Sequence, residues 1–271
     1  MSPGEPPFSA PPPWRIVHFD AIDSTSDEAR RRALAGDPGR LWIVAGEQSA
    51  GRGRRGRTWI SPKGNLYASA LLMEPCPPAI AAQLGFVAGV AIARAAEDIG
   101  AEARLKWPND LVSRGVKCAG LLVEGVSLPR NRLACIVGLG VNCESAPSGA
   151  GYPTARLKDG SGRPADRGSL FQRLAIRFDE TLAQWEAGAA FETIRALWLE
   201  RSGALGEPIR IENARGRREG TFGGLDPDGR LLFRGKSGIE VVDAADLWIL
   251  PASDGSPVAA MSASRAREGR T

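Results

Sequence analysis

The chain has 271 residues, of which 43% are hydrophobic and 24% charged, and its 35 basic and 31 acidic residues give a net charge of +4 at pH 7. These values are ordinary for a globular protein of one large domain, or of a medium domain and a small one. Four cysteines without paired spacing and a single histidine, His18, argue against a disulfide framework and a structural zinc site.

The N-terminal region is predicted to pass from a disordered segment into a strand and then a helix. Residues 1–13 are rich in proline and are expected to be disordered. Arg15–Phe19 has the alternation of a strand. The Asp-Ser-Thr-Ser-Asp-Glu run that begins at residue 23 starts a helix ending near Gly36, in which Thr25 and Glu28 have the spacing of a capping box.

The most informative segment is the arginine loop, residues 51–57, which reads Gly-Arg-Gly-Arg-Arg-Gly-Arg. Apolar strands are predicted on both sides of it, at residues 41–46 and at Leu66–Met73. Its guanidiniums repel one another, its glycines favour neither helix nor strand, and no apolar side chain anchors it before Trp59. We therefore expect the loop to become ordered around a bound anion. The alternative is a solvated basic linker or an RNA tether, but such tethers lie in low-complexity tails.

An apolar run at residues 80–96 predicts a buried helix that ends near Gly100. Gln83, two glycines and Arg94 interrupt the run, which argues against a membrane span, and the N-terminus has no signal-peptide pattern, so a reduced cytoplasm is favoured. The elements predicted next are strands at Arg104–Lys106, 111–112, 116–124 and Arg132–Val141, a loop at 146–168, and helices at 169–186 and 191–201.

The texture of the sequence changes at residue 206. Short alternating strands separated by glycine-rich or Asp-Pro-Asp-Gly turns are predicted at residues 208–211, 218–222, 231–233 and 240–242. Such closely spaced strands predict a small β-barrel. The expected organisation is a disordered segment (1–13), a main domain (14–203), a C-terminal β-barrel (206–251) and a disordered tail (252–271).

Two further motifs place charged groups beside buried strands. Residues 106–110 read Lys-Trp-Pro-Asn-Asp, which predicts a turn between two strands. Lys117 lies in an otherwise apolar strand, where a buried ammonium needs an anionic partner. That partner is either a ligand or, in a purely structural role, Asp110 or Glu124. Strict alternation of side chains would place Lys117 and Gly120 on opposite faces of this strand.

Together these motifs resemble those of biotin protein ligases over residues 20–142. The matching segments agree in order and spacing, and they are Asp23-Ser-Thr, Glu47-Gln-x-Ala-Gly-Arg-Gly-Arg-Arg-Gly-Arg-x-Trp, Lys106-Trp-Pro-Asn-Asp, Lys117-x-x-Gly-x-Leu-x-Glu and Gly138-x-Gly-x-Asn. The family often has Asn after the Ser-Thr pair, where this chain has Ser26. The resemblance implies an α/β (α+β) fold, with a mixed-sheet catalytic domain of the class II aminoacyl-tRNA synthetase-like, biotin–lipoate ligase type followed by a small C-terminal β-barrel.

The activity that the resemblance implies is ATP-dependent conversion of biotin to biotinyl-5′-AMP and transfer of biotin to a lysine of a carboxyl carrier domain. Mg²⁺ would accompany the nucleotide, and no metal site of the protein's own and no enzyme nucleophile are expected. Biotin would be bound by Ser24, Thr25, Ser26, Gln48, Arg52, Gly53, Arg54, Lys117, Gly120 and Leu122. The nucleotide would be bound by Arg52, Arg54, Arg55, Arg57, Trp59, Asn109, Lys117 and Asn142. The catalytic residues would be Arg52, Arg54 and Lys117 at the carboxylate and α-phosphate, with Asp110 orienting Lys117 or the incoming amine.

The implied partner is the biotin carboxyl carrier domain of a biotin-dependent carboxylase, in the cytoplasm. The segment before the first strand is too short for a helix-turn-helix, so DNA is not expected as a partner. A membrane partner is not expected either, and a homodimer is left open. One alternative is a lipoate or octanoate ligase of the same fold, although the arginine loop is not typical of those enzymes and the related transferases need a reactive cysteine, for which Cys118 is the candidate. The other alternative is a nucleic-acid-binding module that uses the arginine loop.

Overall fold

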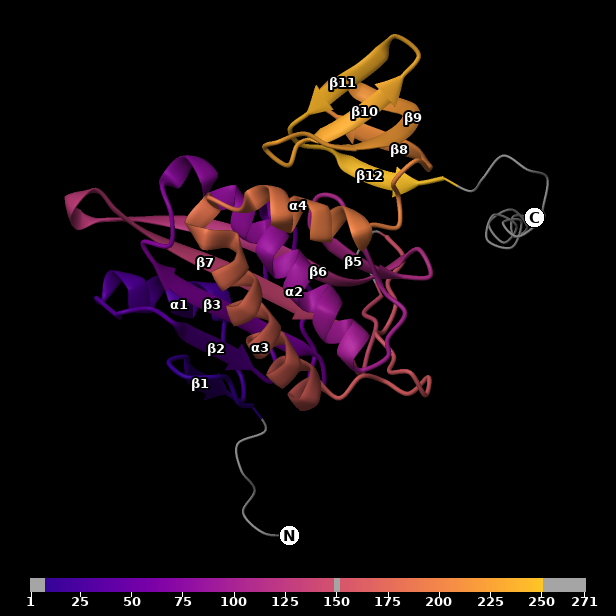
Figure 1. Cartoon of the computed structure of the whole chain (residues 1–271). Coiled ribbons are helices and arrows are strands. Elements are labelled where there is room, and N and C mark those ends of the chain that lie inside the picture. The colour runs from indigo at the N-terminus through magenta and orange to yellow at the C-terminus, as the bar shows by residue number, and fades with distance from the viewer. Residues whose placement is uncertain (1–7, 149–151, 251–271) are drawn as a thin grey trace, which may run out of the picture.

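A computed structural model describes residues 8–148 and 152–250 (Figure 1). Its larger part is a seven-stranded mixed sheet in the order β1-β2-β3-β7-β6-β5-β4, in which only the β1–β2 pair is parallel. The strands are β1 (Arg15–Phe19), β2 (Leu41–Ala45), β3 (Leu66–Met73), β4 (Arg104–Lys106), β5 (Asp110–Ser113), β6 (Val116–Leu128) and β7 (Arg132–Val141). This architecture confirms the predicted mixed α/β fold and each strand predicted before residue 142.

The α-helices of the described residues cover both faces of this sheet. They are α1 (Thr25–Leu34), α2 (Leu84–Asp98), α3 (Arg167–Trp185) and α4 (Phe191–Glu200). Helix α1 lies on one face, where Ala29 and Ala33 join a small apolar cluster with residues of β2, β3, β6 and β7. The other three helices pack on the opposite face, and Figure 1 shows α3 and α4 outside α2. The apolar side chains of both layers thus fix the sheet between them.

Helix α2 is buried because the other helices and the sheet surround it. Most of its residues are buried, and Arg94 reaches the surface to pair with Glu180 at 3.1 Å. Within the described residues, Pro78–Asp98 is the one helical stretch with the length and hydropathy of a membrane span, and 61% of that stretch's apolar window is buried inside the protein. The prediction of a buried helix at this place is confirmed.

Two expectations for the N-terminal region differ from the structure. Residues 1–7 of the segment expected to be disordered lie outside the described residues, but Phe8 is 3% exposed and packs edge-on against Phe171 at 5.3 Å. This aromatic anchor explains why residues 8–13 have a defined place. The helix cap is Ser24 and not Thr25, since the Ser24 hydroxyl accepts from the amide of Asp27 while the Thr25 hydroxyl faces Gln48.

The C-terminal region forms a second, antiparallel sheet beside α4 (Figure 1). Its strands are β8 (Pro208–Asn213), β9 (Gly216–Leu225), β10 (Leu231–Gly235), β11 (Gly238–Val242) and β12 (Asp246–Ile249), in the order β11-β10-β9-β8-β12. Strand β12 was not predicted, and no described pairing joins it to β11 to close a barrel. The Trp107 indole donates to the carbonyl of Gly229 at 3.2 Å, which ties this sheet to the main domain. Residues 251–271, which include the tail expected to be disordered, lie outside the described residues.

Candidate active site

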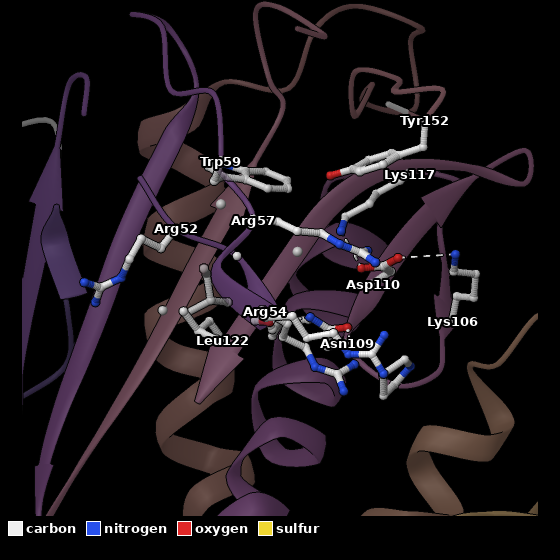
Figure 2. A pocket seen from close by; sticks show the side chains of 18 of the residues that line it. Arg52, Arg54, Arg57, Trp59, Lys106, Asn109, Asp110, Lys117, Leu122 and Tyr152 are labelled. Atoms are coloured by element: carbon white, nitrogen blue, oxygen red, sulfur yellow. Dashed lines mark hydrogen bonds and ion pairs between the residues drawn. The ribbon is translucent and has the colours of Figure 1, made fainter. Parts of the chain in front are cut away.

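A cavity of about 570 Å³ lies where β6 and β7 meet the arginine loop, the turn at residues 107–109 and strand β12. Figure 2 shows Lys106 and Lys117 directed at Asp110 from two sides, with Trp59 above them and Arg52 pointing the other way. The cavity therefore takes its walls from both sheets, and its charged groups gather toward one end.

One end of the cavity is a buried network of neutral polar groups. The Gln48 side-chain oxygen accepts from the Thr25 amide at 2.8 Å and from the Thr25 hydroxyl at 3.1 Å. The Ser69 hydroxyl lies 2.8 Å from that of Thr25 and 3.1 Å from that of Ser26. Ser24, Thr25 and Ser26 are all less than 10% exposed. Hydroxyls and amides held in this way suit a neutral ligand that both donates and accepts hydrogen bonds, as a cyclic urea does.

The wall between the two ends is made of glycines that lie against Trp59. A Cβ atom at Gly140 would lie 2.3 Å from the Trp59 indole nitrogen, and one at Gly120 would lie 3.1 Å from the same ring. At Gly138 it would lie 2.8 Å from the Ser26 hydroxyl. Glycine at these positions therefore lets the Trp59 indole and the Ser26 hydroxyl lie directly against the strand backbones. The absence of side chains also keeps the cavity wide at this point.

A β-bulge brings Lys117 into the cavity beside Gly120. The pairing of β5 with β6 shifts between Leu111 and Val112, so that Cys118 is the extra residue. The Lys117 side chain then reaches over Gly120, where an added Cβ would lie 3.3 Å from the ammonium. The expectation that Lys117 and Gly120 occupy opposite faces was wrong, because it assumed strict alternation and the bulge inverts it for one residue.

Asp110 is a carboxylate at the charged end. It lies 2.7 Å from the Lys117 ammonium and 3.3 Å from the Lys106 ammonium, and its side chain is 12% exposed. The Lys117 ammonium also lies over the Trp59 ring at 5.3 Å and the Tyr152 ring at 5.1 Å. The structural partner considered for Lys117 is therefore present, and two aromatic faces add to its attraction for the ammonium.

The arginines of the loop are divided among three places. Arg54 is partly buried and donates to the Asn109 side chain at 3.2 Å, and burial together with the charge of Arg55 lowers its pKa. Arg52 lies apart from them and pairs with Asp27 at 2.7 Å and Glu124 at 3.2 Å. The expected grouping of Arg52 with Arg54 and Lys117 is therefore not what the structure has (Figure 2).

The other two arginines of the loop pair with a carboxylate of the second sheet. Arg57 lies 2.6 Å and Arg55 3.3 Å from Asp246. The expectation that the loop becomes ordered around a bound anion did not take these carboxylates into account. Carboxylates that are distant in sequence supply counter-charge for three of its guanidiniums.

The predicted site residues other than Asn142 all line this cavity. Asn142 is 2% exposed, and its amide nitrogen donates to the carbonyl of Ala155 at 3.1 Å, so that it supports the loop after β7 and does not face the cavity. No motif indicated the contributions of Tyr152 and of Asp246, which come from a loop and from an unpredicted strand. Lys106 was visible inside a motif, and the alternation of β4 could have indicated its direction.

Among the described residues that line the cavity there is no cysteine or histidine. Cys118 lies behind the wall, donates to the carbonyl of Leu111 at 3.4 Å, and has its pKa raised to about 12 by burial. A thiol of this kind is protonated at neutral pH and is a poor nucleophile. The cavity thus offers a neutral polar end and a cationic end, and Cys118 is not placed to act as a nucleophile in it.

Comparison with known proteins gives consistent matches. Residues 19–142 match the Biotin/lipoate A/B protein ligase family. The chain is 39% identical to a biotin–[acetyl-CoA-carboxylase] ligase of Paracoccus denitrificans, over 83% of this chain and 97% of that protein. It is 30% identical to the ligase of the same name from Mycobacterium tuberculosis, over 86% of this chain and 89% of that protein. A structure of the Aquifex aeolicus biotin protein ligase in complex with biotin and ATP is 27% identical, with a TM-score of 0.73 over 87% of this chain and 99% of that chain.

Proposed function

Because this chain belongs to the biotin protein ligase family, we infer that it converts biotin and ATP into biotinyl-5′-AMP and pyrophosphate and then transfers biotin to a lysine of a carboxyl carrier domain. The observation that best supports this inference is the cavity itself. A neutral polar network closes one end, and cations gather at the other. Biotin has a ureido ring at one end and a carboxylate at the other, so one ligand satisfies both ends.

The polar end is the proposed site of the ureido ring. The hydroxyls of Ser24, Thr25 and Ser26 and the Gln48 amide can exchange their hydrogen bonds for bonds to its N–H and C=O groups. Leu122 and Gly120 would contact the apolar part of biotin, because both line the cavity between its two ends. The valeryl chain would then direct the carboxylate toward Lys117.

At the cationic end, an oxygen of the biotin carboxylate attacks the α-phosphorus of ATP, and pyrophosphate leaves. Both reactants are anionic, so positive groups must offset their repulsion and stabilise the charge that develops on the α-phosphate. We assign this role to Lys117 and Arg54. The place of Arg52 beside Asp27 and Glu124 supports a different role, in which it closes the loop over the biotin end. Arg55, Arg57, Trp59 and Asn109 are proposed for the rest of the nucleotide.

In the second step the amine of the carrier lysine attacks the acyl carbon, and AMP leaves. The amine must lose a proton, which the departing phosphate of AMP or solvent accepts, and Asp110 is a carboxylate at this end of the cavity that can orient the amine. Asp110 is held by two lysines, which suits an orienting role better than that of a strong base. No enzyme side chain needs to carry biotin in either step.

Mg²⁺ is proposed to enter with the nucleotide. Among the described residues there is no group of three acidic, histidine or cysteine side chains that could hold an ion without it. Mg²⁺ commonly keeps several waters and binds through substrate phosphates with one or two protein oxygens. Asp110 and Asn109 offer such oxygens here, and the ion would offset phosphate charge.

The lipoate and octanoate alternative is not favoured. Two relatives that match over most of this chain are biotin ligases, and Cys118 is buried behind the cavity wall with its pKa raised to about 12. A nucleic-acid-binding module remains a second hypothesis only through the arginine loop, three of whose guanidiniums already pair with carboxylates. Such a module would bind RNA or DNA with a steep salt dependence and would ignore biotin.

The finer assignments are proposals that follow from this function. We assign residues 14–203 to a catalytic domain and residues 206–251 to a small β domain that contributes Asp246 and its neighbours to the cavity. A carboxyl carrier domain is the protein substrate, and a cytoplasmic enzyme without DNA or membrane partners fits this role. A homodimer is compatible with it and is tested by light scattering.

Transfer to a carrier domain tests the proposal. The protein is mixed with ATP, Mg²⁺, a biotin carboxyl carrier domain and equal amounts of biotin and lipoate, and intact-mass spectrometry follows the carrier. One biotinyl group is expected on one lysine, and a carrier whose acceptor lysine is changed to arginine should gain none. A carrier that gains lipoyl groups but no biotin would place this protein with the sister enzymes.

A further inference from the structure

Asp246 lies at the start of β12, in the second sheet, yet it contacts the arginine loop. Its two oxygens lie 3.2 and 2.6 Å from the two terminal nitrogens of Arg57, and one of them also lies 3.3 Å from Arg55. The Asp246 side chain is 31% exposed, so the three groups sit at the rim of the cavity. A paired fork of this kind fixes the plane of the Arg57 guanidinium as well as its position.

Strand β12 is held against the main domain beside this contact. The Lys106 ammonium donates to the carbonyl of Leu247 at 3.1 Å, and Leu247 itself is buried in the apolar core. Because Lys106 also pairs with Asp110, the backbone that carries Asp246 is tied to the charged end of the cavity. Asp246 therefore has a fixed place, and the arginines can be ordered by it.

The electrostatics of the loop give this contact its importance. Burial acts to raise the pKa of Asp246, but hydrogen bonds from Arg57 and the charges of Arg57 and Arg55 lower it below its ordinary value. The carboxylate is thus ionised at neutral pH and offsets part of the repulsion among Arg54, Arg55 and Arg57. Without it, these neighbours carry like charges on a glycine-rich loop that has no apolar anchor.

We propose that Asp246 is a positioning residue for the nucleotide: it holds Arg55 and Arg57 in the conformation in which the arginine loop receives the phosphates. This proposal rests on the proposed function only for the identity of the ligand. Strand β12 would then serve the active site through the loop.

A competing effect has the opposite sign and must be weighed. The Asp246 carboxylate is an anion near a site for phosphates, so it also repels them. However, Asp246 and its two arginine partners together carry a charge of +1, and Arg55 uses only one of its nitrogens on Asp246. The cluster therefore remains attractive to an anion and retains donors for it, while loss of Asp246 adds the entropy of an unanchored loop to the cost of binding.

Three variants test the proposal. Asp246→Asn keeps the shape and removes the charge, Asp246→Glu keeps the charge, and Glu219→Gln is the matched control, since Glu219 forms an exposed pair with Arg210 in the same sheet. Amide hydrogen exchange across residues 51–59 is measured on each protein without added ligand. Steady-state kinetics then give KM for ATP, KM for biotin and kcat.

For Asp246→Asn, loop exchange should rise by about three- to fivefold, as expected for the loss of partly exposed ion pairs. KM for ATP should rise by a similar factor, while kcat and KM for biotin stay within about twofold. In Asp246→Glu, loop exchange and KM for ATP should both stay close to those of the unaltered protein. Glu219→Gln should change neither quantity. In a background of Arg55→Gln and Arg57→Gln, Asp246→Asn should add nothing further.

Unchanged loop exchange in Asp246→Asn would overturn the proposal, and so would a lower KM for ATP, which would mean that repulsion of the phosphates outweighs positioning. Equal losses for Asp246→Asn and Glu219→Gln would show a general effect on the second sheet and would also overturn it. Because the exchange measurement uses no ligand, it stands even if the protein fails to use biotin. Failure to use biotin would contradict the proposed function. The role of Asp246 in ordering the loop would then be decided by amide hydrogen exchange alone.

Discussion

Replacing Lys117 with alanine is expected to abolish most adenylation while leaving the protein folded. The Lys117 side chain is 17% exposed and its ammonium lies 2.7 Å from Asp110, so the change removes one partner of a largely buried ion pair. A buried charge left without any partner typically costs roughly 3–5 kcal/mol. Asp110 keeps Lys106 at 3.3 Å, however, so we expect a smaller loss of unfolding free energy, about 1–2 kcal/mol. That corresponds to a melting temperature about 3–6 °C lower.

The effect on the reaction should be much larger than the effect on stability. Lys117 is the cation proposed to stabilise the charge on the α-phosphate, and removing one such donor typically slows a reaction by on the order of 10² to 10³. The assay is a single turnover with enzyme in excess over biotin, in which biotinyl-AMP is quenched and quantified. Rates are expressed per folded molecule, from calorimetry on the same sample.

Lys106→Ala is the matched control for this prediction, because Lys106 pairs with the same carboxylate from its other side. It should lower the melting temperature to a similar extent and slow adenylation by no more than about tenfold, since Lys106 contacts β12 and is not proposed to contact the reacting phosphate. If Lys117→Ala melts early but adenylates biotin at nearly the normal rate, Lys117 is a structural partner of Asp110 and the catalytic assignment is wrong. Equal rate losses in both variants would instead assign the effect to Asp110.

Three other predictions follow from the same geometry. Arg54→Ala should slow adenylation by on the order of 10² without a large change in melting temperature, and a normal single-turnover rate would refute its role. Gly140→Ala should raise KM for ATP by at least about tenfold, because the new Cβ would lie 2.3 Å from the Trp59 indole nitrogen. The control is Gly125→Ala, whose Cβ would meet nothing closer than 3.4 Å and which should be close to neutral in the same kinetic assay. Burial raises the pKa of Cys118 and of two further thiols to about 12, so the folded protein retains protons that unfolded thiols lose near pH 9. The contribution of these thiols to the free energy of unfolding is therefore complete below pH 9, and the melting temperature should fall as the pH rises from 9 toward 12. Reaction of native Cys118 with a thiol reagent at pH 8 would contradict this.

Local patterns in the sequence were sufficient for most of the elements. The apolar runs of β2, β3 and β7 and the long apolar helix α2 are buried in the structure as their patterns predict. The residues that the motifs proposed for biotin also line one cavity. These features depend on neighbouring residues and on short turns, which a single sequence displays directly.

The parts that were missed depend on contacts between distant segments. Nothing near residue 55 in the sequence indicates that Asp246 is its partner, because the contact requires the second sheet to pack beside the loop. The same holds for Arg52, whose side chain follows Asp27 and Glu124 away from the charged end. The β-bulge at Cys118 is visible only in the pairing with β5, and the burial of Asn142 only in its bond to Ala155. Register and long-range charge pairing therefore set the limit of the sequence argument.

Isotope exchange between ATP and pyrophosphate tests the central claim most directly. The protein is incubated with ATP, Mg²⁺ and labelled pyrophosphate, with biotin, with lipoate, or with neither, and label entering ATP is measured together with the mass of the denatured enzyme. We predict exchange that depends on biotin, biotinyl-AMP retained by the native protein, and no mass added to the denatured chain. Exchange with lipoate but none with biotin, or biotin attached covalently to an enzyme side chain, would contradict the account.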